Sequence, residues 1–172
     1  MNTIHTIESY GFKITWKLLE IGLCGTNDFG AQLDKNDITE YLKDSFNSEN
    51  QYITEAISLV CEEDSIKFKN LLKEYAQIEH ADEFNEWRKW RVFLLTSLLD
   101  NINNNDYFHG LLELIEFWDR MGREECPILL PDSKCETLSV DDYFTQTVYD
   151  ESIMKNKSWI MDEVETIISH EK

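Results

Sequence analysis

The side chains that could do chemistry in this sequence are four cysteines, four histidines and a few acidic doublets. No histidine lies four residues from another, and Cys126 and Cys135 lack the second pair that a zinc site requires. The acidic doublets lack the spacing and the glycine of a calcium-binding loop: 62–63, 124–125 and 141–142. No glycine-rich phosphate loop occurs either. We therefore expect no metal ion and no cofactor.

Among the four cysteines, Cys126 is the candidate nucleophile. A reactive cysteine needs a lowered pKa, and the neighbouring Glu124 and Glu125 would raise it instead. We therefore expect an unreactive thiol and no catalytic residue. An enzyme that uses paired carboxylates, around Asp119, Glu116 or the 124–125 doublet, stays open as an alternative.

Arg91 and Asp119 are charged residues that fall on the apolar sides of two expected helices. On a helical wheel, Arg91 lies within the apolar arc of helix 82–102, and Asp119 lies within that of helix 107–121. The two residues are equally far from the centre of the connecting loop. In an antiparallel hairpin they should therefore be level with each other.

A buried arginine without a partner would cost several kcal/mol, so Arg91 requires an acid. We predict a buried Arg91–Asp119 ion pair that fixes the register of the hairpin, with Trp87 or Trp90 packed beside the guanidinium. A pair of this kind serves the structure more often than chemistry. An acid poised in a pocket is the alternative.

The acidic residues are concentrated between positions 113 and 151. This stretch contains eleven acidic and three basic residues, a net charge of −8. Two interpretations remain open: the charge keeps the protein soluble, or it forms a docking surface that attracts a basic partner. The candidate docking residues are Glu113, Glu116, Glu124, Glu125, Asp132, Asp141 and Asp142.

Apolar spacing along the chain indicates helices almost throughout. Thr15 and Asp106 are candidate N-caps, and Gly25 and Gly122 are candidate helix ends. We predict a mainly α protein, a stack of antiparallel helical hairpins in which any sheet is limited to a short N-terminal strand pair around Gly11–Ile14. The expected helices are 16–23, 38–46, 50–61, 64–79, 82–102, 107–121, 140–147 and 156–170.

Length and composition limit the class of protein. A chain of 172 residues is long enough to bury one sizeable core, so we expect a single domain over 1–172. The net charge of −18 argues against binding to nucleic acid or to an anionic membrane. With only 6 Gly and 2 Pro, a many-stranded β-sandwich is excluded. The start lacks the pattern of a signal peptide, so we expect a cytoplasmic protein with free thiols.

Three segments resemble the bacterial domain of unknown function 2247 family: Phe12–Trp16, Glu86–Arg91 and Leu111–Trp118, the last followed by a loop with Pro127 and Pro131. The resemblance covers a core at 10–135 and leaves 136–172 as a C-terminal helical extension. Several members of this family look like immunity proteins of secreted polymorphic toxin systems. The family offers no catalytic residues to carry over.

Together, the charge and the resemblance favour a non-enzymatic, acidic immunity protein. It would neutralise a nuclease-like toxin by covering a basic surface of that toxin. The alternative from a different class is a helical adaptor or scaffold that binds peptide segments in a groove. A large apolar groove would favour the adaptor, and a deep pocket with several shifted carboxylates would favour the enzyme.

Overall fold

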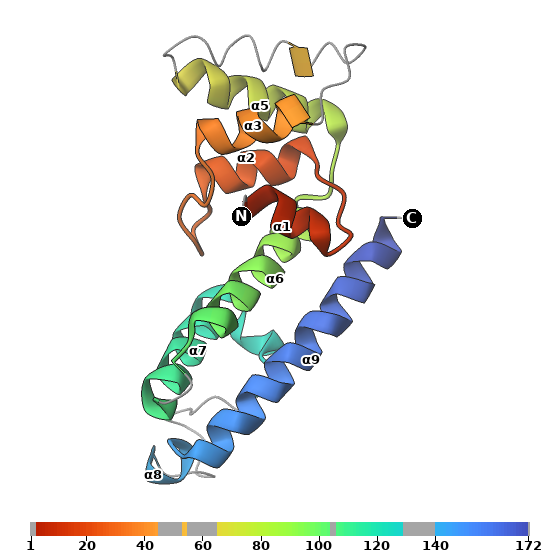
Figure 1. Cartoon of the computed structure of the whole chain (residues 1–172). Coiled ribbons are helices and arrows are strands. Elements are labelled where there is room, and N and C mark those ends of the chain that lie inside the picture. Colours follow the sequence, from red (N-terminus) through yellow and green to blue (C-terminus); the bar gives the residue numbers. More distant parts are fainter. Residues whose placement is uncertain (1–2, 45–52, 55–64, 104–105, 129–139, 172) are drawn as a thin grey trace. The chain divides into compact units, whose positions relative to one another are not determined.

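The computed structural model describes residues 3–44, 53–54, 65–103, 106–128 and 140–171. Within these segments the protein is mainly helical, and none of them forms a strand (Figure 1). The helices are α1 (Thr3–Ser9), α2 (Trp16–Cys24), α3 (Lys35–Asp44), α5 (Ser65–Glu79), α6 (Glu83–Asn101), α7 (Tyr107–Met121), α8 (Val140–Tyr143) and α9 (Gln146–His170), with a 3-10 turn, η1 (Arg123–Glu125).

The chain divides into two compact units. Unit 1 comprises Met1–Trp90 and Ile167–Lys172, and unit 2 comprises Arg91–Thr166. The divisions fall inside α6 and α9, so each of these two helices contributes residues to both units. The single domain over 1–172, with its core at 10–135 and its extension at 136–172, stays a prediction.

Local capping residues fix the helix ends that the sequence predicts. The Thr15 side chain accepts a hydrogen bond from the Leu18 backbone N–H at 3.0 Å, and the Asp106 side chain accepts one from His109 at 3.1 Å. After α7, Gly122 adopts φ +111°, a conformation that L side chains rarely take. These three residues explain why α2 begins, and why α7 begins and ends, where the sequence predicts.

The N-terminal strand pair predicted around Gly11–Ile14 is not formed. Those residues connect two helices, and the residues before them form α1 instead. In α1, Ile4 and Ile7 are almost completely buried, and the helix contacts α3. The i, i+3 spacing of these two isoleucines is a helical signal that the sequence analysis missed.

The C-terminal helix α9 begins ten residues before the predicted start at 156. Thr145 caps it: the Val148 backbone N–H donates to the Thr145 hydroxyl at 3.3 Å. Several of the residues that α9 buries are polar, including Ser152 and Asn156, so hydrophobic periodicity did not reveal its first turns. The predicted helix 140–147 is correspondingly shorter, and α8 ends at Tyr143. The predicted helix 50–61 lies outside the described residues except for 53–54.

In unit 1, α2 and α5 pack against each other, and Trp90 anchors α6 to α2. The Trp90 indole is fully buried and donates a hydrogen bond to the Leu18 carbonyl at 3.0 Å. Gly22 makes this approach possible, because a Cβ there would lie 2.3 Å from the Trp90 ring. Phe29 packs on the same indole, with ring centroids 6.1 Å apart.

In unit 2, α6, α7 and α9 meet around Trp118. The Trp118 indole is fully buried, donates to the Asn156 side chain at 2.8 Å, and meets the Trp159 ring edge-on at 5.0 Å. Farther along, α7 approaches α9 closely at Gly110, where a Cβ would lie 2.5 Å from the Tyr149 ring. Glycine and aromatic residues therefore set the spacing of these helices.

Candidate docking surface and buried ion pairs

Arg91 is fully buried in unit 2 and is held by groups from three elements. It donates to the Met121 carbonyl at 3.2 Å, to Glu163 at 3.1 Å and to Glu125 at 2.5 Å. The Glu163 side chain is 8% exposed and that of Glu125 is 41% exposed. Because one partner is almost as buried as Arg91, the pair links α6 to α9 inside the unit and would be costly to break.

The predicted Arg91–Asp119 pair was wrong. Asp119 lies on the surface and pairs with Arg123 at 3.3 Å, one turn along the chain. The predicted tryptophans were wrong as well, since the rings beside the Arg91 guanidinium are Trp159 at 4.8 Å and Trp118 at 6.0 Å.

The helical wheel of α7 explains the error at Asp119. The apolar arc that contains Asp119 also contains Phe108, but Phe108 is 44% exposed, so this arc is not the buried side of α7. The buried residues centre about 240° from Phe108, whereas Asp119 lies only about 20° from it. Asp119 is therefore about 140° away from the buried side. The buried residues are Gly110, Leu111, Leu114, Phe117, Trp118 and Met121.

Helix α6 buries different sides in its two halves. Glu86 and Lys89 are buried in unit 1, whereas Arg91 and Leu95 are buried in unit 2. On a wheel, the two pairs lie about 170° apart. The helical wheel assumed one buried side along the whole helix. It therefore predicted the burial of Arg91 but not that of Glu86 and Lys89.

Those charges form a second buried ion cluster, which the sequence analysis did not identify. The Lys89 ammonium is fully buried and contacts Glu86 at 2.9 Å, Glu171 at 2.5 Å and the Lys13 carbonyl at 2.8 Å. Burial raises the pKa of Glu86, although Lys89 and Thr15 act against that shift. The i, i+3 spacing of Glu86 and Lys89 is the one sequence signal for this pair.

The predicted docking acids lie on several elements of unit 2. Glu113 and Glu116 are exposed on α7, Glu124 is exposed on η1, and Asp142 is exposed on α8. Asp132 lies outside the described residues, and the side chain of Asp141 does too. Glu125 is exposed but also binds Arg91, so its first role is structural. Carboxylates that face solvent in this way can attract a basic partner over several ångströms.

Glu113 of α7 and Asp150 of α9 both act on Tyr149. Burial raises the pKa of Tyr149, and the negative charges of Asp150 and Glu113 raise it further. Two carboxylates from different helices of unit 2 therefore act on the same tyrosine. This observation extends the acidic surface from α7 to α9.

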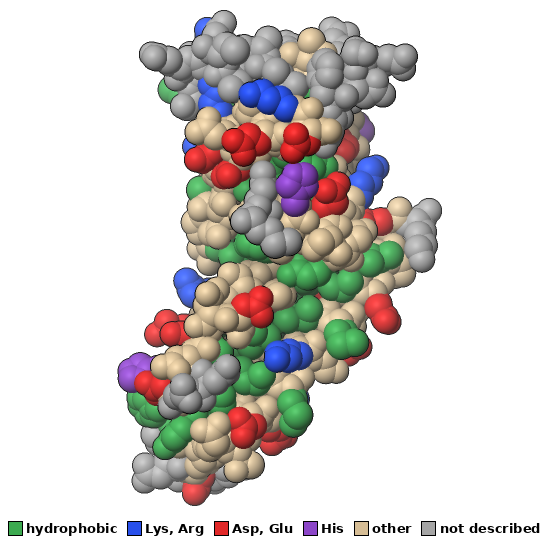
Figure 2. All heavy atoms as spheres, viewed as in Figure 1, with side chains coloured by type: hydrophobic (Ala, Val, Ile, Leu, Met, Phe, Trp, Pro, Cys, Tyr) green, Lys and Arg blue, Asp and Glu red, His purple; other side chains and the backbone are tan. Residues whose placement is uncertain are grey.

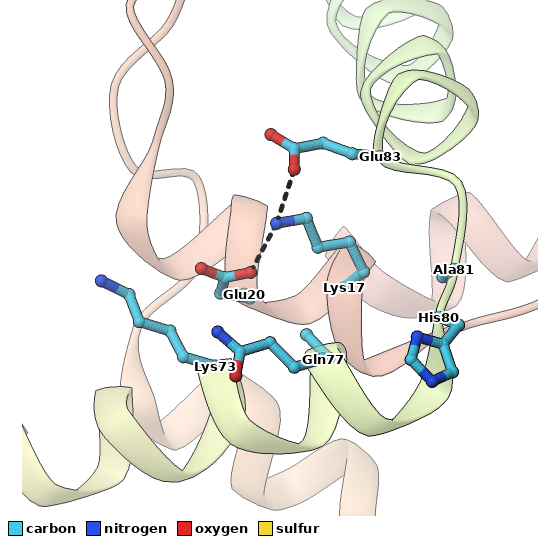
Figure 3. Close-up of a pocket in the computed structure, with 8 residues that line it drawn as sticks. Lys17, Glu20, Lys73, Gln77, His80, Ala81 and Glu83 are labelled. Carbon is cyan, nitrogen blue, oxygen red and sulfur yellow. Dashed lines mark hydrogen bonds and ion pairs between the residues drawn. The ribbon is translucent and has the colours of Figure 1, made fainter.

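Unit 1 has an open hollow of about 590 Å³ beside α2 and α5 (Figure 3). At its edge, the Lys17 ammonium lies between Glu20 at 2.9 Å and Glu83 at 3.0 Å. Burial alone would lower the pKa of Lys17, but hydrogen bonds and attraction from the two carboxylates outweigh burial and raise it. The lysine charge is therefore already compensated by protein groups.

The pKa of the Cys126 thiol is raised, although the main cause is burial and not the neighbouring Glu124 and Glu125. Its pKa is raised to about 11, first by burial and further by Asp119, while a backbone N–H at Ile128 and the charge of Arg123 act in the opposite direction. At neutral pH the group is therefore a thiol and not a thiolate. Cys24 and Cys126 are not in disulfides. Cys61 and Cys135 lie outside the described residues.

Two features are absent from the segments that the structure describes. In those segments, no group of three or more His, Cys, Asp or Glu side chains could hold a metal ion. The helices found there include none that is long and apolar enough to cross a membrane.

Comparisons with known proteins give one match. A family model described as an uncharacterised protein conserved in bacteria, domain of unknown function 2247, matches residues 4–164. No curated protein and no solved structure matches the chain. The match extends beyond the 10–135 segment that carries the resemblance and includes most of the C-terminal region. Because it spans nearly the whole sequence, the chain belongs to the bacterial domain of unknown function 2247 family.

Proposed function

We propose that this protein is a non-enzymatic, acidic binding protein of the bacterial cytoplasm that neutralises a nuclease-like toxin domain by covering its basic surface. The observation that carries the proposal is the set of exposed carboxylates on unit 2: Glu113, Glu116, Glu124 and Asp142. Among the described residues, no ion pair involves the side chain of Glu113, Glu116 or Glu124. Their charges are therefore available to a partner.

The charge of the two units supports the same proposal. Unit 2 has sixteen acidic and six basic residues, a net charge of −10 in 76 residues. Unit 1 has eighteen acidic and ten basic residues, a net charge of −8 in 96 residues. A concentration of one sign of charge raises the rate at which an oppositely charged protein associates.

A rigid helical scaffold would present this surface. The α6–α7 pair is antiparallel, since Arg91 contacts Met121 at one end and Ile102 lies beside Gly110 at the other. The buried Arg91 cluster joins α9 to this pair. We propose that the remaining helices continue the predicted stack of antiparallel hairpins.

Co-expression tests the proposal. The candidate partner is a basic toxin domain encoded beside this gene, and its expression alone should stop growth. Co-expression with this protein should restore growth, and the two purified proteins should elute as one complex. Failure of the wild-type protein to protect cells or to form the complex would contradict the proposal.

A matched pair of variants separates a local surface from total charge. Glu113→Lys/Glu116→Lys reverses two exposed negative charges of unit 2. Glu40→Lys/Glu74→Lys makes the same change of charge at exposed positions of unit 1. The first variant should lose protection and the second should keep it. If the two variants lost protection equally, the acidic residues of unit 2 would serve general solubility and not a local docking surface.

A further inference from the structure

Helix α9 buries polar side chains and leaves apolar ones toward solvent. Its buried residues in unit 2 are Tyr149, Ser152, Asn156 and Glu163, which are 2%, 2%, 0% and 7% exposed. Met154 and Met161 are 66% and 67% exposed. Ile153, Ile160 and Val164 are only half-buried. Three of the four buried residues are therefore polar, whereas a helix on a protein surface usually buries its apolar side.

A helical wheel shows that the two sides are separate. The buried residues of α9 in unit 2 centre about 100° away from the apolar residues Ile153, Met154, Ile160, Met161 and Val164. We call these five residues the α9 face. Figure 2 shows hydrophobic side chains gathered over α9, with a basic side chain among them and acidic ones at the border. Core packing of unit 2 therefore covers only part of the α9 face and leaves Met154 and Met161 exposed.

The spacing on this face suits another helix. Ile153 and Ile160 are seven residues apart, as are Met154 and Met161, so two apolar rows repeat every two turns. Rows of this kind accept the ridges of an amphipathic helix. Methionines are adaptable in shape and recur on surfaces that bind helical segments.

The net charge of unit 2, more than the few charges on the α9 face itself, indicates the sign of its partner. Asp150 and Glu165 are exposed at its border, and Lys157 is the basic residue within it. The nearby Lys155 is paired with Glu151 at 2.7 Å. The face is thus set in a unit of net charge −10, which attracts a basic segment and repels a second copy of this chain.

We propose that the α9 face docks a basic amphipathic helix of a protein partner. The inference rests on the proposed binding function and deepens it: the carboxylates attract the partner, and the α9 face holds one of its helices. Apolar contacts at the centre of an interface with a charged rim usually supply most of the affinity.

Synthetic peptides test this surface without knowledge of the partner. The first peptide has about 18 residues, with leucine and lysine arranged at the helical period, and the second has the same composition in scrambled order. Fluorescence anisotropy at physiological salt should show that the periodic peptide binds at least about tenfold more tightly than the scrambled one. Equal binding of the two would mean that only charge is recognised, and it would overturn the proposal.

Variants of the two exposed methionines locate the site. Met154→Glu/Met161→Glu should weaken binding of the periodic peptide by about tenfold or more. Met154→Ser/Met161→Ser should also weaken it, without a change of charge. The control Ile66→Glu/Ile78→Glu alters exposed apolar residues of unit 1, 72% and 51% exposed, and should bind as the wild type does. Because the altered side chains are exposed, circular dichroism should show folded proteins.

The outcomes separate this inference from the proposed function. Unchanged peptide binding by both methionine variants would overturn the docking face. A dimer that the methionine variants dissolve would assign the face to a second copy and would also overturn it. Peptide binding at the α9 face without protection against the toxin would retain the face and reject the toxin as the partner.

Discussion

At Arg91 the chain places a positive charge where solvent does not reach. Two carboxylates and a backbone carbonyl compensate that charge, and two indoles flank the guanidinium. Such a cluster is costly to form and more costly to break, because removal of one partner leaves the other charge buried. Arg91 is therefore fully engaged inside unit 2 and is not accessible to a partner.

Arg91→Met should lower the free energy of unfolding by about 3–5 kcal/mol, since Glu163 would stay buried without its cation. Chemical denaturation measures this loss. The control Arg123→Met removes a surface pair and should cost at most about 1 kcal/mol. The double variant Arg91→Met/Glu163→Leu should recover part of the loss. An Arg91→Met protein as stable as the wild type would contradict this account of the cluster.

Cys126 should react slowly with alkylating reagents. Its pKa of about 11 leaves only about one part in a thousand as thiolate at pH 8. Iodoacetamide at pH 8 should therefore modify the exposed Cys24 well before Cys126, as measured by peptide mass spectrometry. In denaturant the two should react at similar rates. Preferential labelling of Cys126 in the folded protein would revive a nucleophilic role.

At the scale of the element, the close contact of α7 with α9 depends on a missing side chain. Gly110→Ala would place a methyl group 2.5 Å from the Tyr149 ring. Either the Tyr149 ring or the helices must then shift, which should cost about 1–3 kcal/mol in thermal or chemical unfolding. Gly30→Ala is the control, because no atom lies within 4 Å of its Cβ position and the change should be nearly neutral. Equal stability of the two variants would show that the contact is looser than described.

Helix ends could be predicted from the sequence where a single residue decides them. Thr15, Asp106 and Gly122 act through their own side chain or backbone conformation, so local sequence is sufficient. The buried side of a helix depends instead on what the helix packs against. Helix α6 buries opposite sides in the two units, and α9 buries polar residues, so no periodicity in either sequence identifies the inward side.

In the candidate site too, features that depend on local sequence could be predicted, and features that depend on packing could not. Exposure of Glu113, Glu116 and Glu124 could be predicted, because acidic residues seldom lie in a core without a partner. The structural role of Glu125 could not be predicted, since it depends on how the turn after α7 places it beside Arg91. The α9 face could not be predicted either, because it is recognised only when the buried residues are known.

At the scale of the whole molecule, the net charge of −18 is the feature that a partner meets first. At a pH near the isoelectric point of about 4.4 this charge disappears, and with it the attraction for a basic protein. At neutral pH the attraction acts over roughly one Debye length, about 8 Å at 0.15 M salt. The proposed function therefore requires association that is fast and sensitive to salt.

Stopped-flow association with the neighbouring toxin domain tests this claim most directly. The association rate of the wild-type protein should fall steeply as the salt concentration rises, and Glu113→Lys/Glu116→Lys should associate about tenfold or more slowly at low salt. Glu40→Lys/Glu74→Lys should associate nearly as fast as the wild type. A rate that is independent of salt, or one that the two variants lower equally, would contradict the account of unit 2 as the docking surface.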